Sequence, residues 1–357
     1  MPLILDDRQV RDLLTMEDCV AAMEEAYAEL AEGRGIYRVR TDMIAGTDTP
    51  DDIFALKSMD GVVPKFGVGA IRINSDTLHY RRDGNRLRRD RVPSDDDGRY
   101  TGFVMLFSTK TGELLLIYPD GIQSKRVASI SALGIRHLAR KNSRHVGLIG
   151  SGVQARAQVE AALAVMEVET IRCYSTSAER RETFCGAMAA KHDVDIRPVA
   201  RPEDAVKGAD VVLCGTNSRN HVFFRDWIEP GMHVSCINMF ELEPAVIHAA
   251  DVVSTHIRDC DPIFIKTEGV GILPEEPGAG FQNLAAETGF ASLPTIGEVI
   301  AGRAPRRTSD RRVSCMVNSV GCGYQFAVVG YVLNRKARAA GIGAEIPGDW
   351  FTSTPER

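Results

Sequence analysis

The sequence predicts an α/β fold in which a domain with a doubly wound parallel sheet, residues 126–310, is inserted into a discontinuous α+β domain, residues 1–125 and 311–357. Three observations support this prediction. Strand-like patterns fill residues 36–120, short strands alternate with helical segments from residue 145, and a long apolar helix near the C-terminus has no place in that alternation. A chain of 357 residues is long enough to form both parts.

The first part of the chain is expected to begin with a helix and to continue as strands. Thr15 and Asp18 form a capping-box pattern, apolar residues follow at helical spacing from Val20, and Gly33 ends the helix. Further on, the residues TKTG at 109–112 predict a hairpin turn between two apolar strands.

A strongly charged segment, residues 81–99, interrupts these strands with seven arginines, five aspartates and almost no apolar residue. We expect a solvated, partly mobile loop there. The alternative is a lid or an intersubunit arm that brings arginines to an anionic ligand.

The second part of the chain alternates short apolar strands with helical segments such as 178–191 and 202–207, which predicts a parallel doubly wound sheet. Residues 316–343 are expected to form a long helix that is apolar in its first half, basic in its last turn and ended by Gly341. We expect this helix to return to the N-terminal part, which makes the outer domain discontinuous.

Composition and charge narrow the possible partners. The formal net charge of −5 argues against nucleic acid. No apolar run approaches the length of about 18 residues that a membrane span needs, and the start MPLILDDRQV lacks the features of a signal peptide. The eight cysteines form no C-x-x-C pair, and five of them lie in apolar stretches, so we expect a reduced, cytoplasmic enzyme.

A glycine turn follows the apolar run HVGLI, where Gly150, Gly152 and Ala155 make the pattern G-x-G-x-x-A. The first glycine allows a tight turn, the second lets the main chain approach a diphosphate, and the small third residue lets strand and helix pack closely. Because the pattern lies between a predicted strand and a predicted helix, it predicts a Rossmann dinucleotide-binding domain. The alternative is a tight turn that binds no ligand.

The end of the next strand bears on the choice of dinucleotide. Ser175, Thr176 and Ser177 stand there with Arg180 nearby, and no carboxylate occupies the position that usually binds the ribose hydroxyls of NAD. Hydroxyls and an arginine favour the 2′-phosphate of NADP(H) over NAD(H). Alternatively, or in addition, these hydroxyls cap the following helix.

Several segments together resemble the ornithine cyclodeaminase/mu-crystallin family, which includes alanine dehydrogenases and ketimine or imino-acid reductases. The matching segments lie at residues 111–140, 146–163, 209–218, 231–238, 241–253 and 295–310. The resemblance implies that the outer domain binds substrate and forms a homodimer. It also implies that a small amino, imino or keto acid with a carboxylate lies against the nicotinamide ring.

The resemblance also assigns cations to this acid, since arginine binds a carboxylate through two parallel hydrogen bonds. Arg126 matches the family arginine at the start of the helix after the hairpin. Arg40 resembles a second clamp arginine, with Arg38 as the alternative, and Arg72 falls where many members carry a lysine near the reacting carbon. Lys57 is a further cation that could face the pocket. For each of them the alternative is an ordinary ion pair or a solvated residue.

The predicted cofactor-binding residues combine the glycine turn, the two following strand ends and the family matches. They are Gly150, Ser151, Gly152, Val153, Gln154, Ala155, Ser175, Thr176, Ser177, Arg180, Thr216, Asn217 and Asn238.

A catalytic acid of the cyclodeaminases is missing, because the loop that carries an aspartate in them has only Met239 and Phe240 between Asn238 and Glu241. The resemblance gives Glu241 a capping or stabilising role, with catalysis as the alternative. His233 is expected to pack or to hydrogen-bond within its strand. His256 with Asp259 and Asp261 lacks standard ligand spacing, so we predict no metal site.

These observations lead to three hypotheses. The first is an NAD(P)-dependent oxidoreductase that moves hydride at a carbon–nitrogen bond of a small amino or imino acid, with Arg126, Arg40 and Arg72 holding the carboxylate. The second is an amino-acid cyclodeaminase, an ammonia-lyase that recycles bound NAD. The third is a protein that binds NADPH and a small ligand without turnover.

Overall fold

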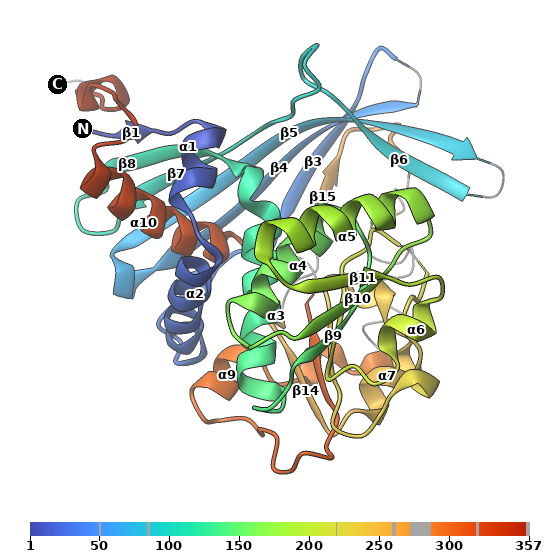
Figure 1. The fold of residues 1–357 in the computed structure, drawn as a ribbon. Coiled ribbons are helices and arrows are strands. Elements are labelled where there is room, and N and C mark those ends of the chain that lie inside the picture. Colours follow the sequence, from blue (N-terminus) through green and yellow to red (C-terminus); the bar gives the residue numbers. More distant parts are fainter. Residues whose placement is uncertain are drawn as a thin grey trace.

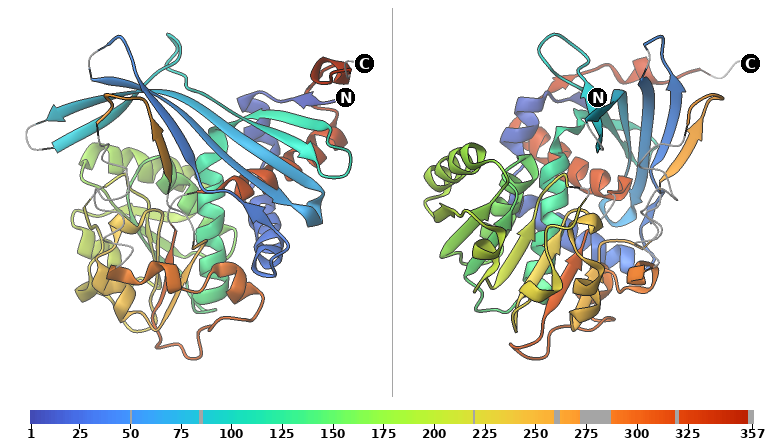
Figure 2. Two further views of the ribbon diagram at one scale, coloured as in Figure 1. Left: turned by 180° about the vertical axis from the view of Figure 1, so that it is seen from behind. Right: turned by 90° about the vertical axis from the view of Figure 1, so that its right-hand side faces the viewer.

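Two β-sheets organise the chain in a computed structural model, which describes residues 1–49, 51–83, 86–218, 220–258, 262–271, 287–318 and 321–354 (Figure 1). The chain has the predicted α/β fold. Figures 1 and 2 show the first sheet lying over the second, with helix α3 running from one to the other.

The first sheet is mainly antiparallel. In spatial order its strands are β15 (Ile263–Lys266), β3 (Thr41–Gly46), β4 (Asp52–Val63), β5 (Val68–Asp83), β7 (Thr101–Ser108), β8 (Leu114–Pro119), β1 (Leu3–Ile4) and β17 (Ala344–Glu345), while β2 (Ile36–Tyr37) pairs with β4 and β6 (Arg86–Val92) pairs with β5. The predicted hairpin is confirmed, because the turn at 109–112 joins β7 to β8.

The helices that accompany this sheet are α1 (Asp7–Leu13), α2 (Met16–Ala31) and α10 (Gly323–Ala340). The prediction for α2 is confirmed, since the Thr15 side chain accepts from the Asp18 amide and a capping box is present. The predicted return of the C-terminal helix is also confirmed, because α10 packs on β4, β5 and α2.

The second sheet is parallel throughout the described residues. Its strand order is β11 (Asp195–Pro198), β10 (Thr170–Tyr174), β9 (His145–Ile149), β12 (Val211–Cys214), β13 (His233–Cys236), β16 (Ser314–Val317) and β14 (Val252–Thr255). The helices that accompany this sheet are α3 (Gln123–Leu138), α4 (Val153–Leu163), α5 (Ala178–His192), α6 (Pro202–Val206), α7 (Pro244–Ala249) and α9 (Ile296–Ile300). The order reverses between β9 and β12, and ligands bind at such a switch point in open α/β sheets.

The expected domain boundary at residues 310 and 311 is wrong. Strand β16 follows it and pairs with β13 and β14 inside the second sheet, so the C-terminal helix begins at Gly323 and not near residue 316. The residues of β16 are fully buried, and such a short apolar run fits a buried strand as well as the start of an apolar helix. Strand β15 also departs from the expected division, since it pairs with β3 of the first sheet.

The expectation of a loop across residues 81–99 is also wrong in part. Strand β5 extends to Asp83, and β6 pairs with it antiparallel over Arg86–Val92. The sheet ladder is made by main-chain hydrogen bonds, which a charged edge strand can form without an apolar face. The segment therefore widens the first sheet.

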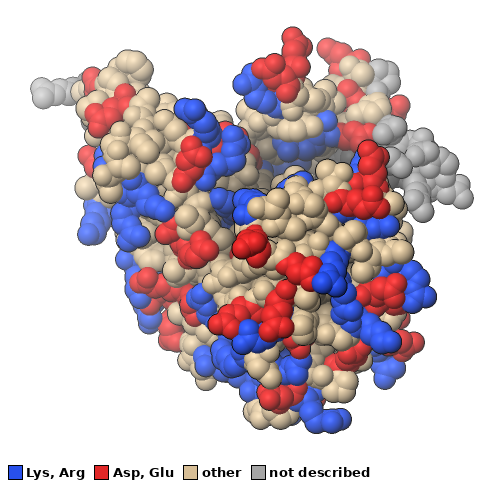
Figure 3. Space-filling view, viewed as in Figure 1, with Lys and Arg blue, Asp and Glu red and all other residues tan. Residues whose placement is uncertain are grey.

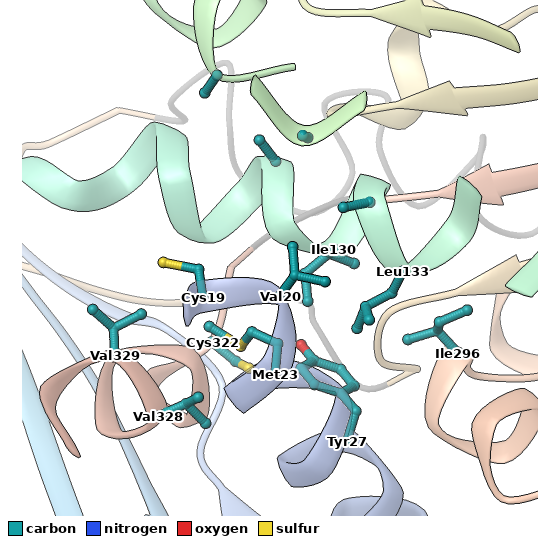
Figure 4. Close-up of a cluster of buried hydrophobic side chains, with 14 of the residues drawn as sticks. Cys19, Val20, Met23, Tyr27, Ile130, Leu133, Ile296, Cys322, Val328 and Val329 are labelled. Carbon is teal, nitrogen blue, oxygen red and sulfur yellow. The ribbon is translucent and has the colours of Figure 1, made fainter. Parts of the chain in front are cut away.

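One apolar core fixes α3 against the first part of the chain. Figure 4 shows Cys19, Val20 and Met23 of α2 close to Ile130 of α3 and Val328 of α10. All five side chains are fully buried. Each buried aliphatic side chain of this size contributes about 1.5–3 kcal/mol, so the core holds α3 in one position relative to the first sheet.

Candidate active site

A cavity of about 1190 Å³ lies between the two sheets, and its wall is strongly cationic. The outer face in Figure 3 carries basic and acidic side chains interspersed over the surface. The cavity wall differs, because it has six cations and three acids: Arg40, Lys57, Arg72, Arg91, Arg99 and Arg126 against Asp7, Asp76 and Asp120. An anionic ligand therefore fits this space.

The second sheet contributes the glycine turn beside this cavity. Gly150 follows β9 with φ +121, and a Cβ atom there would lie 2.4 Å from the Gly215 carbonyl oxygen, so the position requires glycine. Gly152 caps α4 with an extended backbone, and a Cβ atom there would meet no atom within 4 Å. Ala155 is fully buried and its main chain lies against Gly215. The predicted strand–turn–helix geometry is present.

The residues around this turn fit a dinucleotide diphosphate. Val153 at the first turn of α4 is 71% exposed, although it is apolar. The Gln154 side-chain oxygen is buried and accepts no hydrogen bond within the described chain. The Ser151 hydroxyl donates to the Ser175 hydroxyl at 2.9 Å, which joins the turn to the end of β10. Helix α4 directs the unpaired amides of its first turn toward the open space at Gly152, as anion sites at helix starts do.

At the end of β10, the capping role considered for the hydroxyls is confirmed for Ser177, which accepts from the Arg180 amide at 3.3 Å. The side chains of Thr176 and Arg180 are exposed. Arg181, which the sequence did not single out, donates to the Ser175 carbonyl at 2.7 Å.

Glu241 joins the ends of β12 and β13, next to Asn217 and Asn238 of the cavity wall. Its carboxylate is fully buried and accepts from the Thr216 amide and hydroxyl at 2.6 and 2.7 Å, and from the amides of Ile237 and Asn238 at 2.9 and 3.2 Å. Burial raises the pKa of Glu241 to about 7, while these four donors act in the opposite direction. The structure gives Glu241 the stabilising role, since both carboxylate oxygens are engaged by the protein.

Replacing Glu241 with glutamine is expected to loosen both strand ends. The new amide group would face two N–H groups that now donate to an oxygen, and leaving such buried donors unsatisfied costs about 1–3 kcal/mol. We expect a lower melting temperature and weaker dinucleotide binding, measured by calorimetry and by NADPH fluorescence titration. A Glu243→Gln variant is the matched control, because this neighbouring carboxylate accepts from the Arg225 amide at 2.8 Å and is not shared between two strand ends. Equal behaviour of the two variants would contradict the role given to Glu241.

Arg126 lies on α3 with its guanidinium at the cavity wall and is 4% exposed. It donates to the side-chain oxygens of Gln325 at 2.6 Å and Gln123 at 2.9 Å, and it lies 4.8 Å from the ring centroid of Phe326. Burial lowers the pKa of Arg126 to about 10, and the charge of Arg72 acts in the same direction. Within the described residues its hydrogen-bond partners are neutral, and Asp120, whose charge acts on the guanidinium, is bonded to Arg72 instead.

Arg72 on β5 also faces the cavity, but it has an acidic partner that sequence reasoning missed. Its Nε and Nη2 donate to Asp120 at 2.9 and 2.5 Å, and Asp120 also accepts from Gln123 at 3.3 Å. Asp120 begins a short 3-10 turn, Asp120–Ile122, directly before α3. In the sequence, the sign that Asp120 belongs to this site was its position within two helical turns of Arg126.

The remaining predicted cations divide between the cavity and the surface. Arg40 lines the cavity, whereas Arg38 is half exposed, donates to Asp60 at 2.7 Å and lies outside the cavity wall. The structure therefore supports Arg40 over Arg38. Lys57 lines the cavity and donates to Asp76 at 2.8 Å.

Of the predicted cofactor-binding residues, Val153, Asn217 and Asn238 line the same cavity as Arg126. The Asn238 side chain caps the short turn Met239–Glu241 by accepting from the Phe240 amide at 3.1 Å. The glycine turn and the cationic wall therefore meet at one space.

The histidines considered in the sequence lie elsewhere. His233 is buried and hydrogen-bonds with the Ser314 hydroxyl at 2.9 Å, and burial lowers its pKa to about 3, which confirms the predicted packing role. His256 is buried, while Asp259 and Asp261 lie outside the described residues. Across the described parts of the chain, no three metal-ligating side chains cluster. In those same parts, no helix has the length and apolar character that crossing a membrane requires.

A doubly wound sheet whose glycine turn meets a cation-lined cavity under a second sheet defines the class of two-domain, dinucleotide-dependent oxidoreductases. The chain belongs to the ornithine cyclodeaminase/mu-crystallin family, whose model matches residues 91–338.

Individual relatives match nearly the whole chain. A putative dehydrogenase of Rhizobium meliloti is 26% identical over 95% of this chain and 97% of its own length. A Delta(1)-pyrroline-2-carboxylate reductase of Bacillus cereus is 22% identical over 96% of this chain and 99% of its own length. The structure of the Thermococcus litoralis Delta(1)-pyrroline-2-carboxylate reductase in complex with NADH and L-proline is similar with a TM-score of 0.76 at 21% identity, covering 96% of this chain and 100% of that one. The likeness to this structure shows the shared fold.

Proposed function

We propose that this protein is an NAD(P)-dependent oxidoreductase that reduces a small imino acid to an amino acid, or runs the reverse reaction. The observation that carries the proposal is Arg126, a buried guanidinium at the cavity wall whose partners in the described chain are neutral. A buried guanidinium that no carboxylate hydrogen-bonds is costly, and a substrate carboxylate supplies that partner.

The wall residues explain how the substrate is oriented. Arg126 binds the α-carboxylate, Arg40 lies on the same wall, and the Arg72–Asp120 pair stands near the reacting carbon. The bound nicotinamide supplies or accepts the hydride. In the reductive direction an imino acid, NAD(P)H and a proton give the amino acid and NAD(P)⁺, and the positive wall favours hydride addition to the imine carbon.

The dinucleotide is proposed to lie over Gly150–Ala155, with Thr216, Asn217 and Asn238 beside the nicotinamide. We propose NADP(H) as the preferred form, with NAD(H) as the alternative. The exposed Thr176 and Arg180 at the end of β10 support this preference, because a hydroxyl and a guanidinium suit a 2′-phosphate.

A lyase reaction of the cyclodeaminase kind has less support. It needs an acid that moves protons at the side-chain amine. The acid at the end of β13, Glu241, accepts four hydrogen bonds from the protein itself and is fully buried. Net reduction therefore agrees better with this site.

A homodimer in the cytoplasm is proposed as the working form. The face of the first sheet that points away from the cavity exposes Met43, Phe54, Ile263 and Ile265 between 37% and 55%. An exposed apolar stripe of this kind is typical of a protein interface. The cytoplasm is proposed because the seven cysteines described are buried and unpaired.

The reaction is tested by following NADPH at 340 nm with imines formed from 2-oxo acids and ammonia or methylamine. We expect net oxidation of NADPH, with NADH used less efficiently. Release of ammonia from an amino acid without a net change at 340 nm would favour the lyase. Saturable NADPH binding without turnover across the substrate panel would favour a binding protein.

A further inference from the structure

A chain of hydrogen bonds joins two arginines of the cavity wall through one carboxylate and one amide. Arg72 donates to Asp120 Oδ2 from Nε and Nη2 at 2.9 and 2.5 Å, and Gln123 donates to the same oxygen at 3.3 Å. Arg126 in turn donates to the side-chain oxygen of Gln123 at 2.9 Å. All four residues line the cavity. The amide of Gln123 is therefore the spacer between the Asp120 carboxylate and the Arg126 guanidinium.

The two oxygens of the Asp120 carboxylate have different surroundings. Oδ2 accepts the three hydrogen bonds from Arg72 and Gln123, whereas Oδ1 accepts none from the residues that the structure describes. The side chain is 15% exposed and belongs to the cavity wall. Each oxygen of a carboxylate has two lone pairs, and shielded polar atoms are normally hydrogen-bonded. Oδ1 is therefore open to a donor from a ligand in the cavity.

Gly102 on β7 leaves room for this carboxylate. A Cβ atom at Gly102 would lie 2.6 Å from Cγ and from both carboxylate oxygens of Asp120. Non-bonded heavy atoms pack at about 3.5–4.0 Å, so any side chain at this position would displace the carboxylate. Gly102 also lines the cavity. The place of the Asp120 carboxylate is thus fixed by its donors on one side and by the bare main chain of β7 on the other.

The other acids described in the cavity wall offer no such oxygen. Asp76 uses both of its oxygens, since Oδ2 accepts from Lys57 and Oδ1 accepts from Arg91, each at 2.8 Å. The side chain of Asp7 is 49% exposed. Among these described acids, Asp120 alone combines a shielded position with an oxygen that no described donor occupies.

We propose that Asp120 Oδ1 accepts a hydrogen bond from the reacting nitrogen of the substrate and holds the imine in its protonated form. This proposal rests on the proposed function, in which Arg126 binds the α-carboxylate. In an α-amino or α-imino acid one carbon separates the carboxylate from the nitrogen. The Gln123 amide separates their two partners by one carbon in the same way. The head of the substrate therefore spans Arg126 and Asp120 side by side with this amide.

A carboxylate at the nitrogen favours reduction. A protonated imine carries an N–H donor and a positive charge, and a nearby carboxylate stabilises both. Hydride addition forms the C–H bond at the imine carbon and moves the electron pair of the C=N π bond to the nitrogen, which neutralises its charge. The proton that is hydrogen-bonded to Asp120 stays on the nitrogen, so Asp120 remains ionised throughout. Asp120 thereby orients the C=N bond and raises the fraction of imine that can accept hydride.

The experiment compares amino acids with the 2-oxo acids that have the same side chain. Calorimetry measures their binding to the NADP⁺-loaded protein for L-alanine and pyruvate, L-norvaline and 2-oxopentanoate, and L-glutamate and 2-oxoglutarate. In Asp120→Asn, Arg72 and Gln123 hold the amide oxygen on their side, so the new N–H group faces the cavity. We expect the amino acid to bind at least about 10-fold more weakly and the oxo acid to bind equally or more tightly.

Further variants separate this role from mere support of Arg72. Arg72→Met leaves the Asp120 carboxylate in the cavity, so the amino acid should keep its advantage over the oxo acid. The double variant Arg72→Met/Asp120→Asn should lose that advantage, and it removes both partners of the ion pair in case Asp120→Asn alone folds poorly. Asp60→Asn is the matched control, because Asp60 accepts from Arg38 at 2.7 Å on the same sheet but outside the cavity wall. It should change no affinity by more than about 2-fold.

Equal weakening of amino and oxo acids in Asp120→Asn would overturn the proposal, as would an amino-acid advantage that survives in the double variant. The proposed function fails separately, if no imine is reduced and no amino acid is oxidised. In that case the calorimetric comparison still decides whether Asp120 binds the nitrogen. If none of the six acids binds the wild-type protein, both proposals fall.

Discussion

Replacing Arg126 with glutamine is expected to lower kcat/KM for a carboxylate-bearing substrate by about 100-fold or more. Removing one partner of a buried, charge-assisted hydrogen-bond pair costs about 2–5 kcal/mol, which corresponds to a loss of about 30-fold to several thousand-fold. In this cavity the other anchoring arginines already have acidic partners, Asp42 for Arg40 and Asp120 for Arg72. They therefore compensate poorly for the lost guanidinium.

Folding stability should respond to this substitution in the opposite direction. Arg126 is a buried cation that no carboxylate of the described chain hydrogen-bonds, and burial already lowers its pKa to about 10. A neutral side chain removes that desolvation cost. We therefore expect a melting temperature equal to or above that of the wild type, with NADPH affinity unchanged.

The control for Arg126→Gln is Arg38→Gln, which removes a half-exposed arginine outside the cavity. This control should leave kcat/KM within about 2-fold, since exposed ion pairs contribute little. An unchanged kcat/KM in an Arg126 variant that folds normally would contradict the proposal that Arg126 binds the substrate carboxylate.

The glycine turn could be predicted from the sequence because its constraints are local. Gly150 needs a positive φ and a bare Cα against Gly215, and Gly152 needs an open face. A strand, a turn and a helix lie within 20 residues of chain there, so their order already determines the geometry. The same holds for α2, whose capping box and apolar spacing lie within one helix.

The wall of the cavity could be predicted only in part, because its pairings join distant residues. The sequence named Arg72 but not Asp120, which is 48 residues away and reaches it only after β5 and β7 pair. It treated Arg91 as part of a loop, since the ladder between β5 and β6 depends on main-chain contacts that a charged pattern does not reveal.

The segment after residue 310 shows a different limit. Cys315, Met316 and Val317 are apolar and fully buried, and this pattern suits either a buried strand or a helix. The choice depends on whether β13 and β14 leave a gap between them, which is a property of the assembled sheet. The sequence pattern therefore indicates that this element is apolar and buried, whereas its position in the sheet depends on the strands that pair with it.

Replacing Gly152 with glutamate is expected to weaken dinucleotide binding by about 100-fold or more. The residue caps α4 with φ −91, and a Cβ atom there would meet nothing within 4 Å, so the new side chain fits without moving the backbone. Its carboxylate would occupy the amides at the start of α4 that the diphosphate needs, and it would repel the diphosphate charge. Fluorescence titration with NADPH measures this loss.

The same change should leave the folded protein intact or make it slightly more stable. An acidic group at the start of a helix contributes about 0.3–1 kcal/mol, so the cofactor-free variant should melt at or above the wild-type temperature. Gly152→Ala tests the added Cβ alone and should bind NADPH within a few-fold of the wild type. Gly186→Glu places the same charge on exposed helix α5, where a Cβ atom also meets nothing within 4 Å, and should not change the affinity. If Gly152→Glu bound NADPH as tightly as these controls, the diphosphate would have to lie elsewhere. The reaction proposed for the cavity would then have no hydride donor there.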